Sequence, residues 1–303
     1  MNTRVTVRLI LIFGVLAISG AAIFIRQAQA EPIAIAFYRM AFAALMMVPW
    51  AVYDLKHMAV RAVSWKALAL AGFFLALHFA LWNTSLFYTS VTSSVVLVTT
   101  QPIFVTILGA ALLREIPTRR TWLGLALAIS GSAVVAAAGG GGEASRLTGN
   151  AMALAGAVMA ASYFLVGRVA RRTVPVGLYG AAAYGFSALF LFAAALLFRQ
   201  PLTGFNAATW RSLFYLALVS TVIGHTSLNW ALKYLPTSMV SVSILGEPIG
   251  ATILAMALLK EPPALLEIVG GVLILTGIGV IFQQSSGEDV QDGNAGSAEK
   301  TSV

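Results

Sequence analysis

The chain has 303 residues, of which 59% are hydrophobic and 10% are charged, and its formal charge is +8. With a mean hydropathy of +0.88, this composition excludes an ordinary soluble domain and predicts a polytopic membrane protein. The absence of cysteine excludes disulfide bonds and thiolate metal sites. The basic residues stand in short groups between apolar stretches, so they indicate membrane topology rather than a nucleic-acid partner.

Apolar windows of roughly twenty residues, long enough to cross a bilayer as helices, recur along the chain. They predict an all-α fold with ten transmembrane helices, at 7–26, 32–53, 66–87, 92–113, 119–138, 149–168, 176–198, 210–232, 238–259 and 264–282. The first window also resembles a secretory signal, because Ala28-Gln29-Ala30 after it has the pattern of a cleavage site. We favour a retained helix, since the run from Leu9 to Ile25 is long for such a signal.

The two halves of the chain match each other without a gap when the sequence is shifted by 146 positions. The shift takes Asn83 to Asn229, Tyr88 to Tyr234, Pro102 to Pro248, Thr106 to Thr252, Glu115 to Glu261, Pro117 to Pro263, Gly124 to Gly270 and Gly131 to Gly277. Shared hydrophobicity does not explain matches on Asn, Glu, Gly and Pro. We infer an internal duplication, with repeats at 7–138 and 149–282, a linker at 139–148 and a disordered cytoplasmic tail at 283–303.

The number of spans in each repeat determines how the repeats are oriented. Because each repeat has five spans, the second must enter the membrane from the opposite side, which makes the repeats inverted. If the N-terminus is cytoplasmic, thirteen of the 19 Lys and Arg residues fall on the cytoplasmic side and five on the other, with Arg39 inside a span. The positive-inside rule therefore predicts that both termini are cytoplasmic.

Two corresponding spans contain a proline near the middle, in the pairs Gln101-Pro102 and Glu247-Pro248. A proline removes a backbone hydrogen bond and crowds the carbonyl one turn earlier, so we expect a helix break at both places. Corresponding broken helices in two halves are the sequence feature that best indicates a transporter site near the bilayer midplane.

Arg39 and Glu247 are the strongly ionisable residues well inside the predicted spans. At about 1.5 Å per helical residue their depths differ by several ångströms, which is compatible with a direct or water-bridged pair. In a functional interpretation Glu247 carries a proton or binds a substrate amine, while Arg39 binds a carboxylate or tunes Glu247. In a structural interpretation the two side chains form a permanent link between helices.

Further polar and aromatic residues lie at membrane depth. His78, Trp82 and Asn83 fall close to one helix face, and His225, Asn229 and Trp230 repeat that composition in the other half. Thr99, Thr100 and Gln101, with Ser241 and Ser243, place hydroxyl and amide groups beside the proline breaks. These residues are candidates for a hydrated cavity, although packing, interfacial anchoring and satisfaction of freed carbonyls explain each of them equally well.

The sequence contains no pattern typical of an enzyme. His-Glu-x-x-His, Gly-x-Ser-x-Gly and a glycine-rich phosphate loop are absent, and Asp54, Asp289 and Asp292 lie at a span end or in the tail. We therefore expect a non-enzymatic protein without a cofactor or metal. A secondary transporter is the first interpretation, a passive facilitator or channel the second, and a membrane scaffold or intramembrane enzyme the third.

The paired broken helices, the turns Leu112-Leu113-Arg114-Glu115 and Leu258-Leu259-Lys260-Glu261, and the stretch from Pro32 to Arg39 resemble EamA-type members of the drug/metabolite transporter superfamily. The resemblance covers essentially Leu9 to Phe282. It implies a multi-pass transporter of the bacterial inner membrane that exports amino acids or related metabolites, or drugs, through a central cavity. The lipid bilayer, a small-molecule substrate and protons are the partners it suggests. An aromatic cavity including Tyr163 is compatible with an aromatic amino acid.

Overall fold

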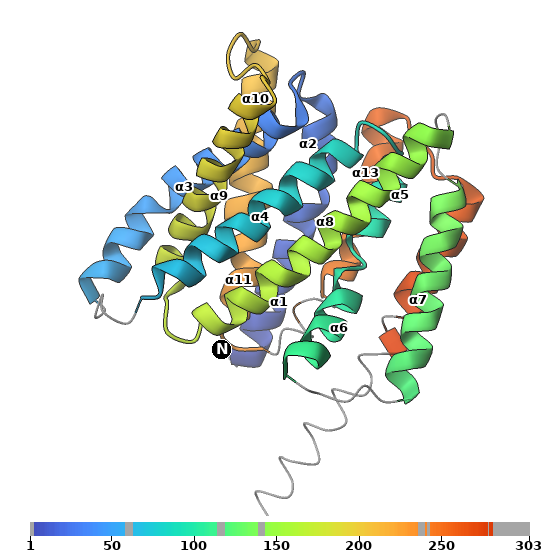
Figure 1. Cartoon of the computed structure of the whole chain (residues 1–303), viewed down its shortest axis with the longest axis horizontal. Helices are drawn as coiled ribbons and strands as arrows, with labels where there is room; N and C mark the ends of the chain where they lie inside the picture. The colour runs from blue at the N-terminus through green and yellow to red at the C-terminus, as the bar shows by residue number, and fades with distance from the viewer. Residues whose placement is uncertain are drawn as a thin grey trace, which may run out of the picture.

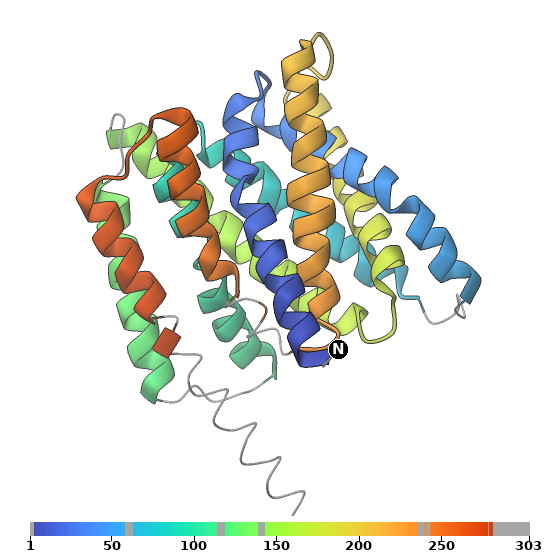
Figure 2. The ribbon, with the colours of Figure 1, turned by 180° about the vertical axis from the view of Figure 1, so that it is seen from behind.

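The computed structural model describes residues 3–57, 63–113, 119–138, 143–235, 240, 243–277 and 279–280. These residues form helices joined by short turns, and none of them belongs to a strand. The helices pack as one bundle, shown from two sides in Figures 1 and 2. Their bounds are α1 Thr3–Ser19, α2 Ala21–Gln27, α3 Pro32–His57, α4 Trp65–Ser85, α5 Val91–Val98, α6 Gln101–Leu113, α7 Arg119–Ala138, α8 Glu143–Ala170, α9 Val176–Leu197, α10 Ala207–Tyr215, η2 Leu216–His225, α11 Thr226–Ala231, η3 Ile244–Gly246, α13 Glu247–Leu254, η4 Ala255–Leu259 and a last helix at Leu265–Gly277.

The described helices have the lengths and surfaces of membrane spans. Seven of them are long and apolar enough to cross a bilayer, and three shorter apolar helices lie at Trp122–Val135, Glu247–Leu259 and Leu265–Gly277. All coincide with predicted windows, so the all-helical prediction is confirmed. Large apolar side chains are exposed on the outer faces, such as Phe13 on α1 and Leu197 on α9. Such faces are unfavourable in water and suit contact with lipid.

The first half of the chain packs closely against the second. Helix α3 lies against α9, α4 lies against α8, and α1 lies against η2. Figure 2 shows the N-terminus and the lower end of the last helix toward one end of the bundle, with the turn between α2 and α3 at the opposite end. Helix α8 begins at Glu143, so the second part of the expected linker is helical. The expected tail lies outside the described residues.

Helix α7 and the helix at Leu265–Gly277 touch through their backbones and lie side by side in Figure 2. A Cβ atom added to Gly131 would lie 2.6 Å from the carbonyl oxygen of Gly270, and one added to Gly277 would lie 2.5 Å from that of Gly124. Small residues are needed wherever helix backbones approach this closely. The four glycines therefore fix the distance between the two helices.

Helical geometry is interrupted next to both intramembrane prolines. Helix α5 ends at Val98 and α6 begins at Gln101, with Thr99 and Thr100 in the turn between them. In the other half, the 3₁₀ turn η3 precedes α13, and Pro248 occupies the first turn of α13. At that position the N–H group that proline lacks would have had no partner within the helix, so the loss costs nothing.

A π-helical stretch, η2, runs from Leu216 to His225 between the α-helical segments α10 and α11. The hydroxyl of Thr221 donates to the carbonyl oxygen of Leu216, five residues earlier, at 3.3 Å. The hydroxyl of Thr226 donates in the same way to the carbonyl oxygen of Thr221, also at 3.3 Å. These hydroxyls satisfy carbonyl groups in the widened turns, and such turns occur frequently at functional sites.

Two carboxylates hold the N-terminus of α5. One belongs to Glu261, before the last helix, and the other to Glu267, within it; we call this arrangement the α5 clamp. Glu261 accepts from the backbone N–H of Val91 at 2.7 Å. Glu267, 3% exposed, accepts from the hydroxyl of Ser93 at 2.6 Å and from the hydroxyl of Ser90. Carboxylates are favourable at a helix N-terminus because of the helix dipole.

Arg26 joins the α5 clamp to α2. Its guanidinium lies 3.7 Å from the carboxylate of Glu261 and donates to the carbonyl oxygen of Thr89 at 2.9 Å. All eight residues of α5 are buried. This short helix therefore lies wholly inside the bundle, with the α5 clamp at its N-terminus and the turn at Thr99 and Thr100 after its C-terminus.

Candidate functional site

A cavity lies where the two broken helices approach each other in the middle of the bundle. About 450 Å³ not filled by protein atoms lies between its walls, open solvent at its mouth included. Its walls come from α1, α4, α5, α6, α8, η2, α11, η3 and α13. The lining residues are Ile18, Leu75, His78, Trp82, Val98, Thr99, Gln101, Ala160, Tyr163, Phe164, His225, Leu228, Ile244 and Glu247.

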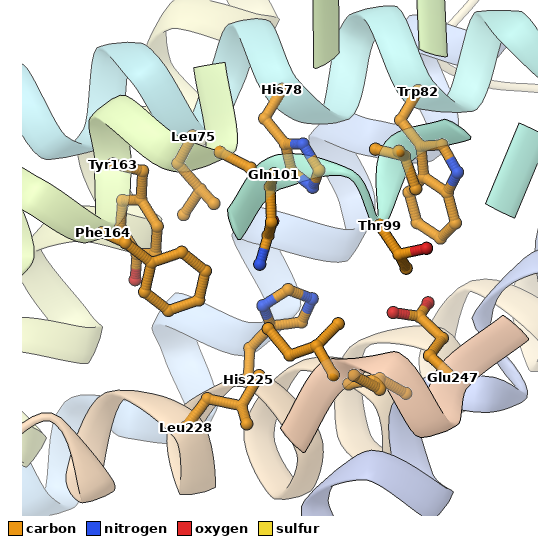
Figure 3. Close-up of a pocket in the computed structure, with 14 residues that line it drawn as sticks. Leu75, His78, Trp82, Thr99, Gln101, Tyr163, Phe164, His225, Leu228 and Glu247 are labelled. Atoms are coloured by element: carbon orange, nitrogen blue, oxygen red, sulfur yellow. The ribbon is translucent and has the colours of Figure 1, made fainter. Parts of the chain in front are cut away.

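Two histidines and an amide face one another across this cavity. Figure 3 shows His78 and Gln101 reaching in from one side and His225 from the other. Nδ1 of His78 lies 3.0 Å from the carbonyl oxygen of Gly156. Because a carbonyl can only accept, Nδ1 carries the proton, and in the neutral ring Nε2 is left as an acceptor. His78 is thereby fixed in one orientation.

Glu247 enters the cavity at the N-terminus of α13 and is 8% exposed. Figure 3 shows its carboxylate pointing toward Thr99, in the turn between α5 and α6. It has no ion pair within 4 Å among the described residues, where the ion pair is that of Arg26 with Glu261. A buried carboxylate without a close partner is costly. The first turn of α13 offsets part of that cost through the helix dipole.

Arg39 lies beside the cavity wall and is fully buried. Its Nε donates to the hydroxyl of Thr221 at 2.8 Å, and its Cζ atom lies 3.9 Å from the centre of the Phe79 ring and 5.7 Å from that of Trp82. Within the described part of the chain, Nη1 and Nη2 have no hydrogen-bond partner. Arg39 and Glu247 are close enough to interact electrostatically, but they form no ion pair within 4 Å.

Hydrogen-bond donors predominate among the polar atoms left without partners around the cavity. Within the described residues they are Nε1 of Trp82, Nε2 of Gln101 and the hydroxyl of Tyr163 on the cavity wall, and Nη1 and Nη2 of Arg39 behind it. Most buried polar groups in proteins have a partner, so a cluster of unpartnered donors calls for an acceptor supplied from elsewhere. The arrangement suits a ligand that brings carboxylate or carbonyl oxygens, with Glu247 available to a cationic group.

The structure brings together six of the ten predicted cavity residues, His78, Trp82, Thr99, Gln101, Tyr163 and His225, along with Glu247. It places the other four away from the cavity lining. Asn83 donates to the carbonyl oxygen of Pro32 at 3.4 Å, and Ser243 donates to that of Val240 at 2.7 Å. Trp230 packs against Tyr234 with ring centres 4.5 Å apart and ring planes tilted by 46°.

The fourth of these residues, Asn229, belongs to a buried cluster next to the cavity. Its side-chain amide donates to the hydroxyl of Tyr184 at 3.1 Å, and its backbone carbonyl oxygen accepts from Nε of Arg171 at 3.1 Å. The hydroxyl of Tyr184 lies 3.0 Å from the hydroxyl of Thr226. Asn83 and Asn229 are therefore repeat mates with structural hydrogen bonds. Ser241 lies outside the described residues.

Several site residues carry no distinctive sequence signal. Phe79 and Thr221 hold Arg39, and Leu75, Phe164 and Leu228 complete the apolar wall. Spacing could have indicated Phe79 and Leu75, since they lie one turn or less from His78 and Trp82 on the same helix. Thr221 could not have been found in this way, because its place depends on packing between helices that are distant in sequence.

Comparisons with known proteins agree with this arrangement. The sequence profile of the EamA-like transporter family matches residues 6–137 and again residues 147–283. A solved crystal structure with 16% sequence identity superposes with a TM-score of 0.68 and covers 92% of this chain and 97% of its own. At that identity the likeness shows the fold alone.

Curated relatives point to the same class. An uncharacterized transporter of Archaeoglobus fulgidus is 26% identical over 294 residues, which is 92% of this chain and 97% of the relative. A probable terminal-alkyne amino-acid exporter of Streptantibioticus cattleyicolor is 34% identical over 199 residues, or 63% of this chain and 64% of that protein. An uncharacterized transporter of Bacillus subtilis, YetK, is 27% identical over 204 residues, or 63% of this chain and 59% of the relative.

The apolar helices thus define a multi-pass membrane protein with an internal cavity. The chain belongs to the EamA-like transporter family.

Proposed function

We propose that the protein is a secondary active transporter that exports a small metabolite of the amino-acid class across the inner membrane of a bacterium. The observation that carries the proposal is the cavity, where the Glu247 carboxylate stands opposite a set of unpartnered donors. An amino acid in its zwitterionic form offers the complementary groups, an ammonium for Glu247 and a carboxylate for the donors.

In this proposal the remaining walls of the cavity set the preference for the substrate's side chain. Tyr163, Phe164, Leu75 and Leu228 present aromatic and aliphatic surface to the cavity, so an apolar or aromatic side chain fits there better than a charged one. The name of the Streptantibioticus relative, a probable amino-acid exporter, supports the same substrate class.

The contacts between helices support two inverted five-helix repeats, and the distribution of Lys and Arg supports cytoplasmic termini. The shift of 146 residues carries the pair α4 and α8 onto η2 and α1, and both pairs are in contact. It also carries the contact of Gly131 with Gly270 onto that of Gly277 with Gly124. Reciprocal contacts of this kind are expected around a two-fold axis. Rocking of one repeat against the other would expose the cavity to each side in turn.

Counterflow in reconstituted vesicles tests the proposal. Vesicles loaded with each of the twenty unlabelled amino acids are placed in a trace of the same labelled compound, and label uptake is measured. A carrier gives saturable uptake that is accelerated by substrate on the far side. Flux that is neither saturable nor accelerated would favour a passive pore, and exchange of bulky cationic drugs without amino acids would favour a multidrug exporter.

A further inference from the structure

Arg39 is fixed at one nitrogen and left open at the other two. Its Nε donates to the hydroxyl of Thr221 at 2.8 Å, and its Cζ atom lies over the Phe79 ring, 3.9 Å from the ring centre. Nη1 and Nη2 are buried and lack a partner in the described part of the chain. A guanidinium recognises a carboxylate through two adjacent N–H groups, so its orientation decides whether it can bind in this way.

The hydroxyl of Thr221 is oriented by the π-helical stretch. Its proton is donated to the carbonyl oxygen of Leu216 at 3.3 Å, which leaves the oxygen lone pairs for Arg39. Thr226 donates to the carbonyl oxygen of Thr221 at 3.3 Å and so supports the same turn. Thr221 is itself fully buried, and no water competes for its lone pairs.

We propose that Thr221 is a positioning residue, which holds the Arg39 guanidinium over the Phe79 ring with its two Nη groups free for the carboxylate of the substrate. The inference rests on the proposed function of the cavity, because it assigns to the substrate the acceptor that Arg39 lacks. Neither Thr221 nor Arg39 is among the residues that line the cavity. Arg39 lies directly behind the wall, 5.7 Å from the ring of the lining residue Trp82, and Thr221 acts through Arg39. The π-helical turn serves substrate selection by aiming this hydroxyl.

Kinetics of three variants test the role of the hydroxyl. Thr221→Val keeps the volume and removes the acceptor, Thr221→Ser keeps the acceptor, and Thr276→Val makes the same change at an exposed threonine that donates to Val272. The substrate is the amino acid that the wild-type protein exchanges fastest among the twenty, and the probe for the carboxylate is the amine obtained from it by decarboxylation.

We expect Thr221→Val to raise the half-saturation concentration of the amino acid about tenfold, the value of one hydrogen bond to a charged group, with an unchanged maximal rate. The decarboxylated amine should be affected less than twofold, and Thr221→Ser and Thr276→Val should match the wild type. An unaltered half-saturation concentration, a Ser variant as impaired as the Val variant, or an equal loss for the amine would overturn the proposal.

A double-mutant cycle on thermal unfolding separates this inference from the proposed function. Thr221→Val removes the donor to the Leu216 carbonyl in either background, but it should lower the Tm by about 2–4 °C more in the wild-type background than in an Arg39→Met background, where the hydroxyl has no guanidinium to hold. Equal shifts in both backgrounds would refute the positioning role even if transport is normal. A wild-type protein that exchanges no amino acid would refute the proposed function, while the cycle would still report on Thr221.

Discussion

Two regions of the molecule bury carboxylates in opposite ways. At the α5 clamp, Glu267 accepts hydrogen bonds from Ser90, Ser93 and the backbone N–H of Ala264, the last at 2.8 Å. In the cavity, Glu247 is buried to a similar degree, 8% exposed against 3%, yet it makes no hydrogen bond and no ion pair within 4 Å among the described residues. Burial alone therefore does not distinguish the two carboxylates.

The difference lies in what each region can gain from a new partner. A carboxylate whose acceptor sites are filled stabilises the helices it joins, and breaking that arrangement leaves buried groups unsatisfied. A carboxylate without partners contributes little to stability and keeps its acceptor sites available for a ligand or a proton. The clamp should therefore govern stability and the cavity should govern transport, which substitutions on the two sides can separate.

Glu247→Gln should have the largest effect. It retains the shape of the side chain but loses the charge that would bind an ammonium or carry a proton, so we expect transport to fall about 100-fold and its pH dependence to flatten. Counterflow measured between pH 5 and pH 9 checks both effects. Glu31→Gln, at an exposed carboxylate before α3, is the control and should behave as wild type; unchanged transport and pH dependence in Glu247→Gln would remove Glu247 from the mechanism.

Arg39→Met should rank next. The substitution takes away the free Nη groups, and we expect transport to fall about 30-fold, while the Tm stays within about 2 °C of the wild type, because a buried cation with one hydrogen bond adds little to stability. Counterflow and thermal unfolding in detergent measure the two effects. A large drop in Tm accompanied by normal transport would make Arg39 a structural residue and erase the contrast with the clamp.

Glu267→Gln should show the reverse behaviour. The amide nitrogen of the new glutamine replaces one of the two carboxylate oxygens that accept from Ser90, Ser93 and Ala264. The free energy of unfolding should therefore fall by about 2 kcal/mol. Thermal unfolding and urea titration provide the measurement. Transport per folded molecule should change much less than in Glu247→Gln, and a carrier that is stable but inactive would contradict the assignment of this cluster to stability.

The effect on transport should be smallest at the glycine crossing between α7 and the last helix. Gly131→Ala and Gly277→Ala should each lower the free energy of unfolding by about 1–3 kcal/mol, because both new Cβ atoms meet a backbone oxygen. As repeat mates they should have equal effects within about 0.5 kcal/mol. Gly109→Ala, where the added atom meets nothing within 4 Å, is the control, and markedly different losses for the two mates would argue against two-fold packing.

The sequence was informative where a residue type is unusual for its surroundings. Glu247 and Arg39 are charges inside apolar spans, and Gln101 and Pro248 interrupt them, so membrane physics alone identified these residues. The paired Asn83 and Asn229 also stood out, but in the structure they make backbone and tyrosine contacts. A polar residue in a span signals only that some partner exists, and the sequence does not say which.

Thr221 shows why other parts of the site were out of reach. Threonines are common in membrane helices, where their hydroxyls usually return to the carbonyl one turn earlier. Its contact with Arg39 spans 182 residues and depends on a π-helical turn. Neither hydropathy nor the repeat predicts a change of helical period, so the residue that holds the buried cation could be found only from the packed structure.

The crossing of α7 with the last helix has a consequence for the history of the chain. Each helix presents two glycines to the other, and the contact of Gly131 with Gly270 is the counterpart of that of Gly124 with Gly277. A surface that is complementary to an inverted copy of itself needs no fusion to assemble. An ancestor with a single five-helix unit could thus have paired with a second molecule inserted the other way up, at the same glycines that now meet within one polypeptide.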